Sequence, residues 1–330
     1  MHIDSSAPTR IDLAGGTYDI WPLYLLHEPA QTINAALGLR ARCTLSSRRD
    51  YRVRLISEDT GEQVEAAGPA ALSFDRLPLI ARLVRHFGAK GVDVRTKSES
   101  PVGAGIAGSS AMTVAVVGAL AAWTGRTLGD DDLLTIAMNI EAQVLGVPAG
   151  MQDYRPALYG GISSVELGVA GVRRVALRVS SGDLESRLVL AYTGASRNSG
   201  INNWDVMVRR INGDVQVAAA FDAIRDAAAA MREALERGDW IGVAHAMDAE
   251  WQARTRLAPG VTTAYIDGLL RHARAAGALA GKVCGAGGGG CLIALVEPDN
   301  RDAVSDAIGE AGATILPLAL DTQGLIVQRT

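Results

Sequence analysis

The sequence contains little cysteine, histidine or lysine. Its three cysteines, Cys43, Cys284 and Cys291, are an odd number without the spacing of metal ligands, so we expect no disulfide framework. The five histidines are scattered, and none pairs with another at ligand spacing. Because zinc ligands come in groups, we expect no structural zinc site. Lysine occurs only at Lys90, Lys97 and Lys282, so almost all basic residues are arginine.

A long apolar run and an excess of positive charge are also missing. The longest apolar helix candidate is shorter than the roughly 20 residues that cross a bilayer, and the N-terminus lacks the basic start and apolar run of a signal peptide. The net charge of −4 argues against a nucleic-acid partner. We therefore expect a cytoplasmic protein with a small-molecule partner and without a membrane partner. A homodimer remains open.

The 330 residues suffice for two domains with a sizeable core. The pattern predicts helices over 79–87, 131–145, 216–237 and 265–276, and strands over 9–14, 92–97, 162–167, 188–192 and 291–296. Residues 40–46 and 51–57 alternate on either side of a Ser-Ser-Arg-Arg-Asp turn, which predicts a hairpin. This mixture predicts an α+β fold of two domains with a seam near 165–190.

The most informative stretch is residues 101–111, Pro-Val-Gly-Ala-Gly-Ile-Ala-Gly-Ser-Ser-Ala, which we call the serine loop. It precedes an apolar segment, 112–123, that is typical of a buried helix. Glycine lets backbone N–H groups approach an anion closely, and a helix N-terminus directs its free N–H groups at the same place. The pattern indicates nucleotide phosphate binding. A glycine-rich turn capped by serine is the alternative reading.

A second motif lies near the N-terminus. Residues 8–19, Pro-Thr-Arg-Ile-Asp-Leu-Ala-Gly-Gly-Thr-Tyr-Asp, form a strand that ends at two glycines. Arg10 at its start is a candidate for stabilising a migrating negative charge, and Asp19 beyond its end is a candidate acceptor for substrate hydroxyls. In isolation, a surface arginine and a turn aspartate explain the pattern better than a functional pair does.

The third motif is the glycine run of residues 282–291, Lys-Val-Cys-Gly-Ala-Gly-Gly-Gly-Gly-Cys. Five glycines among six residues, between two strand-like segments, are too many for a simple hairpin. They are typical of a backbone that passes close to another loop or to a ligand.

In this order and spacing the three motifs resemble those of the GHMP kinases, the family of galactokinase, homoserine kinase, mevalonate kinase and phosphomevalonate kinase. The resemblance extends from about residue 7 to about residue 296. It implies an ATP-dependent phosphotransferase with an alcohol group as acceptor. It also implies an N-terminal ATP-binding domain like ribosomal protein S5, over 1–175, and a ferredoxin-like α+β C-terminal domain over 176–330.

Carried over residue by residue, the resemblance implies the parts of an active site. ATP binding falls on Pro101, Gly103, Gly105, Ala107, Gly108, Ser109, Ser110, Gly287 and Gly288. A Mg²⁺ ion would take Glu141 and one of the two serines, with Ser110 favoured over Ser109. The catalytic base falls on Asp153 and the active-site cation on Arg10. Substrate binding falls on Asp19, Thr17, Gly16, Gln152 and Arg197.

The chain departs from the family pattern at two places. The serine loop is one residue longer than the usual Gly-Leu-Gly-Ser-Ser form, because Ile106 and Ala107 precede Gly108. Gly16 also replaces the sugar-binding glutamate of galactokinases, which counts against galactose as the substrate.

Within the family, the form of residues 14–19 and of 192–199 is most similar to the kinases of D-glycero-D-manno-heptose 7-phosphate. Those enzymes phosphorylate the anomeric hydroxyl, and Arg197 is a candidate for binding the substrate phosphate. The alternatives are another hexose, a uronic acid, or an alcohol of the mevalonate or homoserine type. A further alternative is a sugar-sensing homologue without catalysis.

Overall fold

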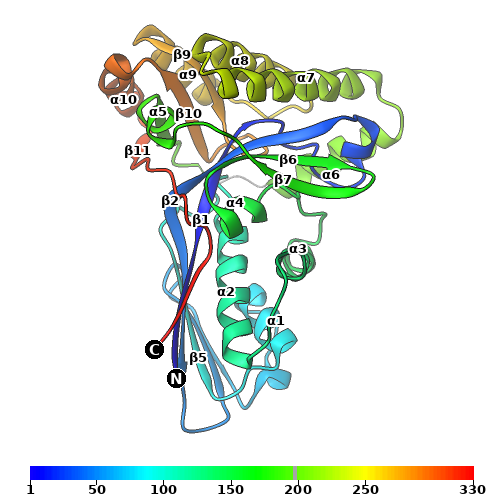
Figure 1. The fold of residues 1–330 in the computed structure, drawn as a ribbon, viewed down its shortest axis with the longest axis vertical. Helices are drawn as coiled ribbons and strands as arrows, with labels where there is room; N and C mark the ends of the chain where they lie inside the picture. The colour runs from blue at the N-terminus through cyan, green and yellow to red at the C-terminus, as the bar shows by residue number, and fades with distance from the viewer. Residues whose placement is uncertain (196–198) are drawn as a thin grey trace.

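The computed structural model describes residues 1–195 and 199–330, without the side chains of 199–202. Its first sheet has eight strands: in spatial order β12 (Ile326–Arg329), β1 (His2–Ala14), β2 (Ala30–Ser47), β5 (Val92–Ser98), β3 (Val53–Ser57) and β4 (Gln63–Ala66), with β6 (Ile162–Gly168) and β7 (Gly171–Ala176) joined to β2. The second sheet has four strands: β11 (Thr314–Leu316), β8 (Leu188–Tyr192), β10 (Cys291–Val296) and β9 (Ala278–Val283). The two sheets lie one above the other along the long axis of the molecule (Figure 1).

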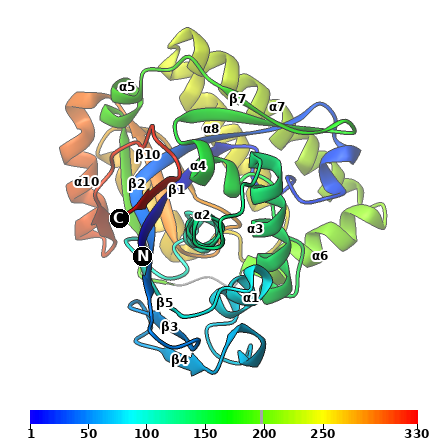
Figure 2. The same cartoon turned by 60° about the horizontal axis from the view of Figure 1, so that its bottom comes forward.

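Helix α2 (Gly108–Thr124) lies at the centre of the first half. It packs on β1 and β2, and α1 (Pro78–Phe87) and α3 (Asp130–Leu145) lie beside it (Figure 2). Every residue from Ser110 to Ala121 is buried, which explains why this segment is apolar all round instead of on one face. The short α4 (Tyr154–Tyr159) closes the same core.

The described helices of the second half are α5 (Ser181–Ser186), α6 (Ser199–Ile211), α7 (Val215–Arg237), α8 (Trp240–Thr255), α9 (Ala264–Ala275) and α10 (Arg301–Glu310). The side chain of Asp214 caps α7, and the left-handed Gly238 ends it. Three short 3₁₀ helices, η1 (Leu23–Leu26), η2 (Pro69–Ala71) and η3 (Pro298–Asn300), complete the described elements. No described helix is both long and apolar enough to span a membrane.

Strand β2 is long enough to have two different partners along one edge. Ala41–Ser47 pairs with β5, whereas Ala30–Ala35 pairs with β6. Arg10 on β1 lies opposite Ala36, where the two pairings separate, and its backbone N–H bonds to the carbonyl of Ile106 at 3.0 Å. The serine loop is therefore tied to the middle of the first sheet.

The predicted hairpin between residues 40–46 and 51–57 is wrong. Strand β5 lies between β2 and β3, antiparallel to the first and parallel to the second. The turn between them crosses the end of β5, where Arg48 N–H bonds to the Gly91 carbonyl and Gly91 N–H to the Tyr51 carbonyl. Alternation predicts each strand correctly but carries no information on which strand fills the place beside it.

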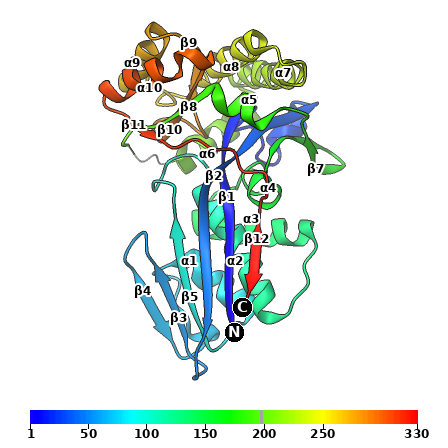
Figure 3. The same cartoon turned by 60° about the vertical axis from the view of Figure 1, so that its left-hand side comes forward.

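The end of the chain returns to the first sheet. Strand β12 pairs with β1, so the two termini lie side by side (Figure 3). A buried ion pair between Arg40 and Asp321 anchors this segment, and Leu325 packs on the core around α2. The two-domain α+β fold is as predicted, although the first sheet takes its last strand from beyond residue 320. The boundary at 175/176 stays a prediction.

Candidate active site

The serine loop connects β5 to α2 through a strained backbone. Gly103, Gly105 and Ala107 all have positive φ, of 70°, 76° and 58°. No side chain caps α2, so its first N–H groups remain free to bind a ligand. A Cβ at Gly108 would lie 2.5 Å from Ser100 Oγ, which explains why this position is glycine. The loop is thus folded to present backbone donors.

A cavity of about 460 Å³ lies over this loop. Its wall contains the loop residues that the resemblance assigns to the nucleotide: Pro101, Gly103, Gly105, Ala107, Gly108, Ser109 and Ser110. Apolar and hydroxyl side chains also line it: Leu77, Leu79, Ile80, Ser57 and Thr96. Apolar lining beside a phosphate-type loop fits a nucleoside triphosphate.

A second cavity, of about 300 Å³, adjoins the first and is more polar. Thr17, Asp19, Gln152 and Asn203 line it, together with the Gly285–Ala286 segment of the glycine run. Both cavities have Arg10, Ser110, Glu141, Leu145 and Asp153 in their walls. These shared residues mark where the contents of the two cavities would meet.

A larger hollow, of about 590 Å³, lies against β6, β7 and α7. Its charged residues already pair within its own wall, because Arg232 bonds to Glu166 at 2.9 Å and Arg173 also pairs with Glu166. None of the residues shared by the other two cavities lines it. The chemistry therefore belongs to the two joined cavities.

Arg10 and Asp153 form a tight ion pair at this junction. Asp153 Oδ1 accepts hydrogen bonds from Arg10 Nε at 3.0 Å and from Nη2 at 2.6 Å. Arg10 Nη1 donates to the Gly105 carbonyl at 3.0 Å, which ties the pair to the serine loop. Burial lowers the pKa of the Arg10 guanidinium, but the charges of Asp153 and Asp12 raise it by a larger amount. Arg10 therefore stays cationic.

Glu141 points a carboxylate into the same region from α3. It is 3% exposed, and its Oε2 has no hydrogen-bond partner among the described residues. Burial raises its pKa, while the nearby hydroxyls of Ser109, Tyr154 and Ser110 act in the opposite direction. An unpartnered buried carboxylate oxygen beside serine hydroxyls is a donor set that suits Mg²⁺.

The described residues hold no group of three or more His, Cys, Asp or Glu side chains that would bind a metal unaided. Mg²⁺ often uses one carboxylate together with substrate phosphates, so the single Glu141 fits an ion that arrives with a nucleotide.

Asp19 is buried in the wall of the second cavity. Gln152 N–H donates to Asp19 Oδ2 at 3.0 Å, and Gln152 Nε2 donates to Oδ1 at 3.4 Å. Burial and the negative charge of Asp153 raise the pKa of Asp19 to about 6. The Oε1 of Gln152 has no partner within the described chain, so the pair retains free acceptors for a ligand.

Three of the residues that the resemblance assigns to the site line neither cavity. Gly16 lines neither cavity, because it packs against Asp12 and Arg254, whose Nη2 would lie 2.3 Å from an added Cβ. Gly287 and Gly288 face the Gly260–Val261 segment and line neither cavity. Arg197 lies outside the described residues.

The contact between the glycine run and the serine loop is made by Gly290. An added Cβ there would lie 2.6 Å from the Ala104 carbonyl oxygen, and Cys291 N–H bonds to that oxygen at 2.6 Å. Both motifs therefore border one site, which the sequence analysis expected, but through a different glycine.

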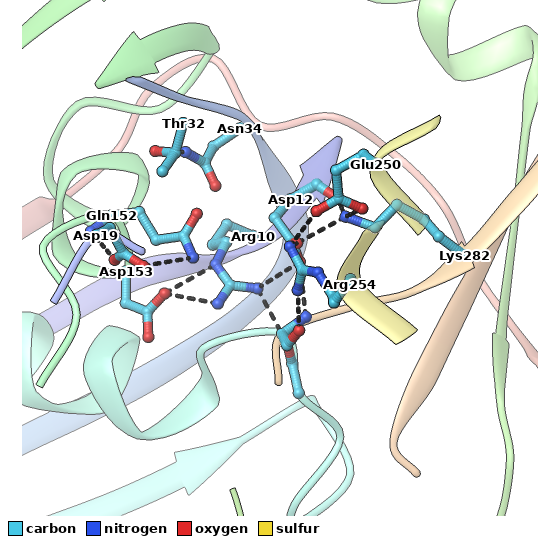
Figure 4. A network of polar contacts seen from close by, with 12 residues as sticks. Arg10, Asp12, Asp19, Thr32, Asn34, Gln152, Asp153, Glu250, Arg254 and Lys282 are labelled. Atoms are coloured by element: carbon cyan, nitrogen blue, oxygen red, sulfur yellow. Dashed lines mark hydrogen bonds and ion pairs between the residues drawn. The ribbon is translucent and has the colours of Figure 1, made fainter. Parts of the chain in front are cut away.

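The resemblance left several residues of the site unassigned. Asn203 reaches the second cavity from α6, and it belongs to the amide-rich stretch 200–204, a composition common where sugars are bound. Glu250 and Arg254 lie on α8 behind Arg10 and form an i, i+4 ion pair that no motif of the sequence indicates. Figure 4 shows Glu250 and Arg254 beside Arg10 and Asp12.

Comparison with known proteins agrees with this geometry. The family model "GHMP kinases N terminal domain" matches residues 77–161, and "GHMP kinases C terminal" matches residues 231–314. The D-glycero-alpha-D-manno-heptose 7-phosphate kinase of Campylobacter jejuni is 30% identical over 91% of each chain. The mevalonate kinase of Pyrococcus furiosus is 28% identical over 99% of each.

A solved structure described as a D-glycero-D-manno-heptose 1-phosphate kinase from Bacteroides thetaiotaomicron superposes with a TM-score of 0.80. It is 25% identical and covers 99% of both chains. The two family models, the 30% identical relative and this fold lead to one conclusion. The chain belongs to the GHMP kinases, a family of ATP-dependent kinases that phosphorylate an alcohol group.

Proposed function

We propose that this protein transfers the γ-phosphoryl group of ATP to a hydroxyl of a sugar phosphate, namely the anomeric hydroxyl of a heptose 7-phosphate-like substrate. The observation that carries the proposal is the junction of two cavities at Arg10 and Asp153, one with a phosphate-type loop and one lined by polar side chains. The heptose 7-phosphate kinase at 30% identity supports the substrate class.

Asp153 acts as the base in this proposal. Both of its hydrogen bonds from Arg10 go to Oδ1, which leaves Oδ2 to accept the proton of the acceptor hydroxyl. Arg10 keeps Asp153 oriented, and its charge offsets the negative charge on the transferring phosphoryl group. Phosphoryl transfer needs mainly positioning and charge neutralisation, which this pair supplies at the junction.

The serine loop and α2 bind the triphosphate through backbone N–H groups and the helix N-terminus. Glu141 and the hydroxyl of Ser110 or Ser109 would hold Mg²⁺, which when bound neutralises the β- and γ-phosphates. The unpartnered Oε2 of Glu141 supports this assignment, because a buried carboxylate oxygen without a donor is costly unless a cation meets it.

Asp19, Gln152, Thr17 and Asn203 bind the hydroxyl groups of the acceptor. Arg10 is the only cation among the described residues that line this cavity, and its charge serves the reaction centre. A distal phosphate of the substrate therefore needs another partner. Arg197 fills that role in the proposal, since a guanidinium binds phosphate oxygens in pairs.

A substrate panel tests the assignment. ADP release is measured with ATP, Mg²⁺ and each of D-glycero-D-manno-heptose 7-phosphate, the heptose without phosphate, galactose, mevalonate and homoserine. The proposal expects the highest kcat/KM with the heptose 7-phosphate, and ³¹P NMR should show a new anomeric phosphate.

Other outcomes of the panel decide against parts of the proposal. Preference for mevalonate or homoserine would overturn the sugar assignment. Equal activity on the heptose with and without phosphate would overturn the role of Arg197. Measurable ATP binding without ADP release on any acceptor would favour a sensor.

A further inference from the structure

Four charged side chains lie completely buried behind Arg10. Asp12 comes from β1, Glu250 and Arg254 from α8, and Lys282 from β9, and all four are 0% exposed. We call them the buried quartet. Figure 4 shows Arg10 between Asp153 on one side and the quartet on the other. The quartet joins both sheets of the molecule at the reaction centre.

The quartet is balanced in charge. Lys282 Nζ lies 2.8 Å from Asp12 Oδ2 and 3.2 Å from Glu250 Oε2. Arg254 Nη2 lies 3.1 Å from Asp12 Oδ2 and also bonds to Glu250. Two cations thus face two carboxylates. Burial opposes ionisation of Asp12, but Lys282, Arg254 and Arg10 hold its pKa well below the usual range.

Asp12 also contacts two groups that line the site, the Gly285 peptide and the Arg10 guanidinium. Its Oδ1 accepts a hydrogen bond from the Gly285 N–H at 2.7 Å and lies 3.5 Å from Arg10 Nη1. Arg254 Nη1 donates to the Gly285 carbonyl, so the quartet holds Gly285 by its N–H and by its C=O. Gly285 is part of the wall of the second cavity, which the proposed function assigns to the acceptor.

Stability alone does not account for this arrangement. Removing four charges from water is costly, and buried ion pairs are often replaced by apolar side chains without loss of stability. The chain also leaves room for the quartet, since Gly16 passes so close that a Cβ would collide with Arg254 and Asp12. The arrangement is explained if the quartet holds Arg10 and Gly285 in place beside the two cavities.

We propose that Asp12, held by Lys282 and Arg254, is a positioning residue that fixes the Arg10 guanidinium relative to the Gly285 peptide. It thereby sets where the acceptor hydroxyl meets the phosphoryl group. The inference rests on the proposed function of Arg10 and Asp153 and adds the residues that orient them.

The test is Asp12→Asn, with kcat and both KM values measured and normalised to the number of nucleotide-binding sites. The asparagine amide would present N–H donors to Lys282 and Arg254, which are themselves donors, so the quartet rearranges. We expect kcat to fall about tenfold to a hundredfold, as small displacements at a reaction centre do. The KM for ATP should change less, within about twofold, because Gly285 does not line the first cavity and Arg10 can keep its bond to the Gly105 carbonyl.

The matched control is Asp4→Asn on the same strand. Asp4 is half exposed, contacts His2 and Thr44, and lines neither cavity, so kcat should not change. Arg254→Lys serves as the second variant if Asp12→Asn does not fold. It keeps the charge but replaces the two nitrogens that reach Gly285 and Asp12 by a single one. It should raise the acceptor KM at least about fivefold while the KM for ATP stays unchanged.

A purely structural role would lower the melting temperature and the number of active sites while leaving kcat per site and both KM values alone. That result in Asp12→Asn, or in Arg254→Lys where the first variant does not fold, would overturn the proposal. A wild-type protein that turns over no acceptor would instead contradict the proposed function, so the two failures are distinguishable.

Discussion

At the scale of one residue, Asp19 lowers the stability of the folded protein near neutral pH. Its carboxylate is buried beside Asp153, and its pKa is raised from 3.8 to about 6. The folded state therefore binds a proton more tightly than the unfolded state. The stability from this group is fully present below about pH 3.8 and is lost as the pH rises towards 6. Near neutral pH the ionised Asp19 costs stability, and in the proposed function it supplies a charged acceptor for substrate hydroxyls.

Asp19→Asn should therefore stabilise the protein near neutral pH and weaken substrate binding. The amide can keep the bond from Gln152 N–H, and a flipped Gln152 side chain can accept from it through the now unpartnered Oε1. A rise in pKa of about two units corresponds to roughly 3 kcal/mol, so we expect a gain of about 1–3 kcal/mol at pH 7.5. Urea denaturation measures this gain, and initial rates should show a raised acceptor KM.

The pH dependence provides the check on this prediction. At pH 4 the carboxyl of Asp19 is protonated in the folded state, so the gain from asparagine should largely disappear. An equal gain in the free energy of unfolding at pH 4 and pH 7.5 would show that ionisation of Asp19 does not destabilise the folded state. An unchanged acceptor KM would remove Asp19 from the binding site.

At the scale of elements, the site depends on two loops held against each other. The serine loop precedes α2 and the glycine run precedes β10, and they meet where Gly290 passes Ala104. The sequence predicts both loops because glycine and serine clusters are local signals. It does not predict which glycine makes the contact, because Gly287, Gly288 and Gly290 are chemically identical and only the tertiary path distinguishes them.

Gly290→Ala tests whether this contact supports nucleotide binding. The residue has a φ of 81°, and the added Cβ would lie 2.6 Å from backbone oxygen of Ala104, so the serine loop must move. We expect the KM for ATP to rise several-fold and the free energy of unfolding to fall by more than the roughly 1–2 kcal/mol that a left-handed alanine costs by itself.

Gly238→Ala is the matched control, because Gly238 has a φ of 67° with nothing within 4 Å of an added Cβ. It ends α7, away from the site, and should show the strain cost alone with an unchanged KM for ATP. If both variants bind ATP like the wild type, the contact between the loops does not position the phosphates.

At the scale of the whole molecule, the sequence predicts far more of the local structure than of the assembly. The helix over 131–145 and the strand over 291–296 match α3 and β10. Each can be predicted because the apolar pattern that indicates it lies within the element itself. The place of β5 between β2 and β3 was not predictable, nor was the return of β12 to β1, since strand pairing depends on distant segments.

The same limit applies to the site. Arg10 and Asp153 are 143 positions apart, and only the resemblance to a family brought them together before the structure did. The buried quartet gave no signal in the sequence, because a burial pattern is a property of the folded molecule. The fold thus brings β1, the start of α4, α3 and the two loops together around the two joined cavities.

The measurement that tests the account most directly is single-turnover phosphoryl transfer by Asp153→Asn, with nucleotide affinity measured in parallel. Asparagine can still accept from Arg10, but its amide cannot take the proton of the acceptor hydroxyl. We expect the rate to fall by about 10²–10⁴, the range for loss of a general base, while the affinity for an ATP analogue stays within about threefold. Asp132→Asn, at an exposed position on α3, should match the wild type. Transfer by Asp153→Asn at near the wild-type rate would contradict the account.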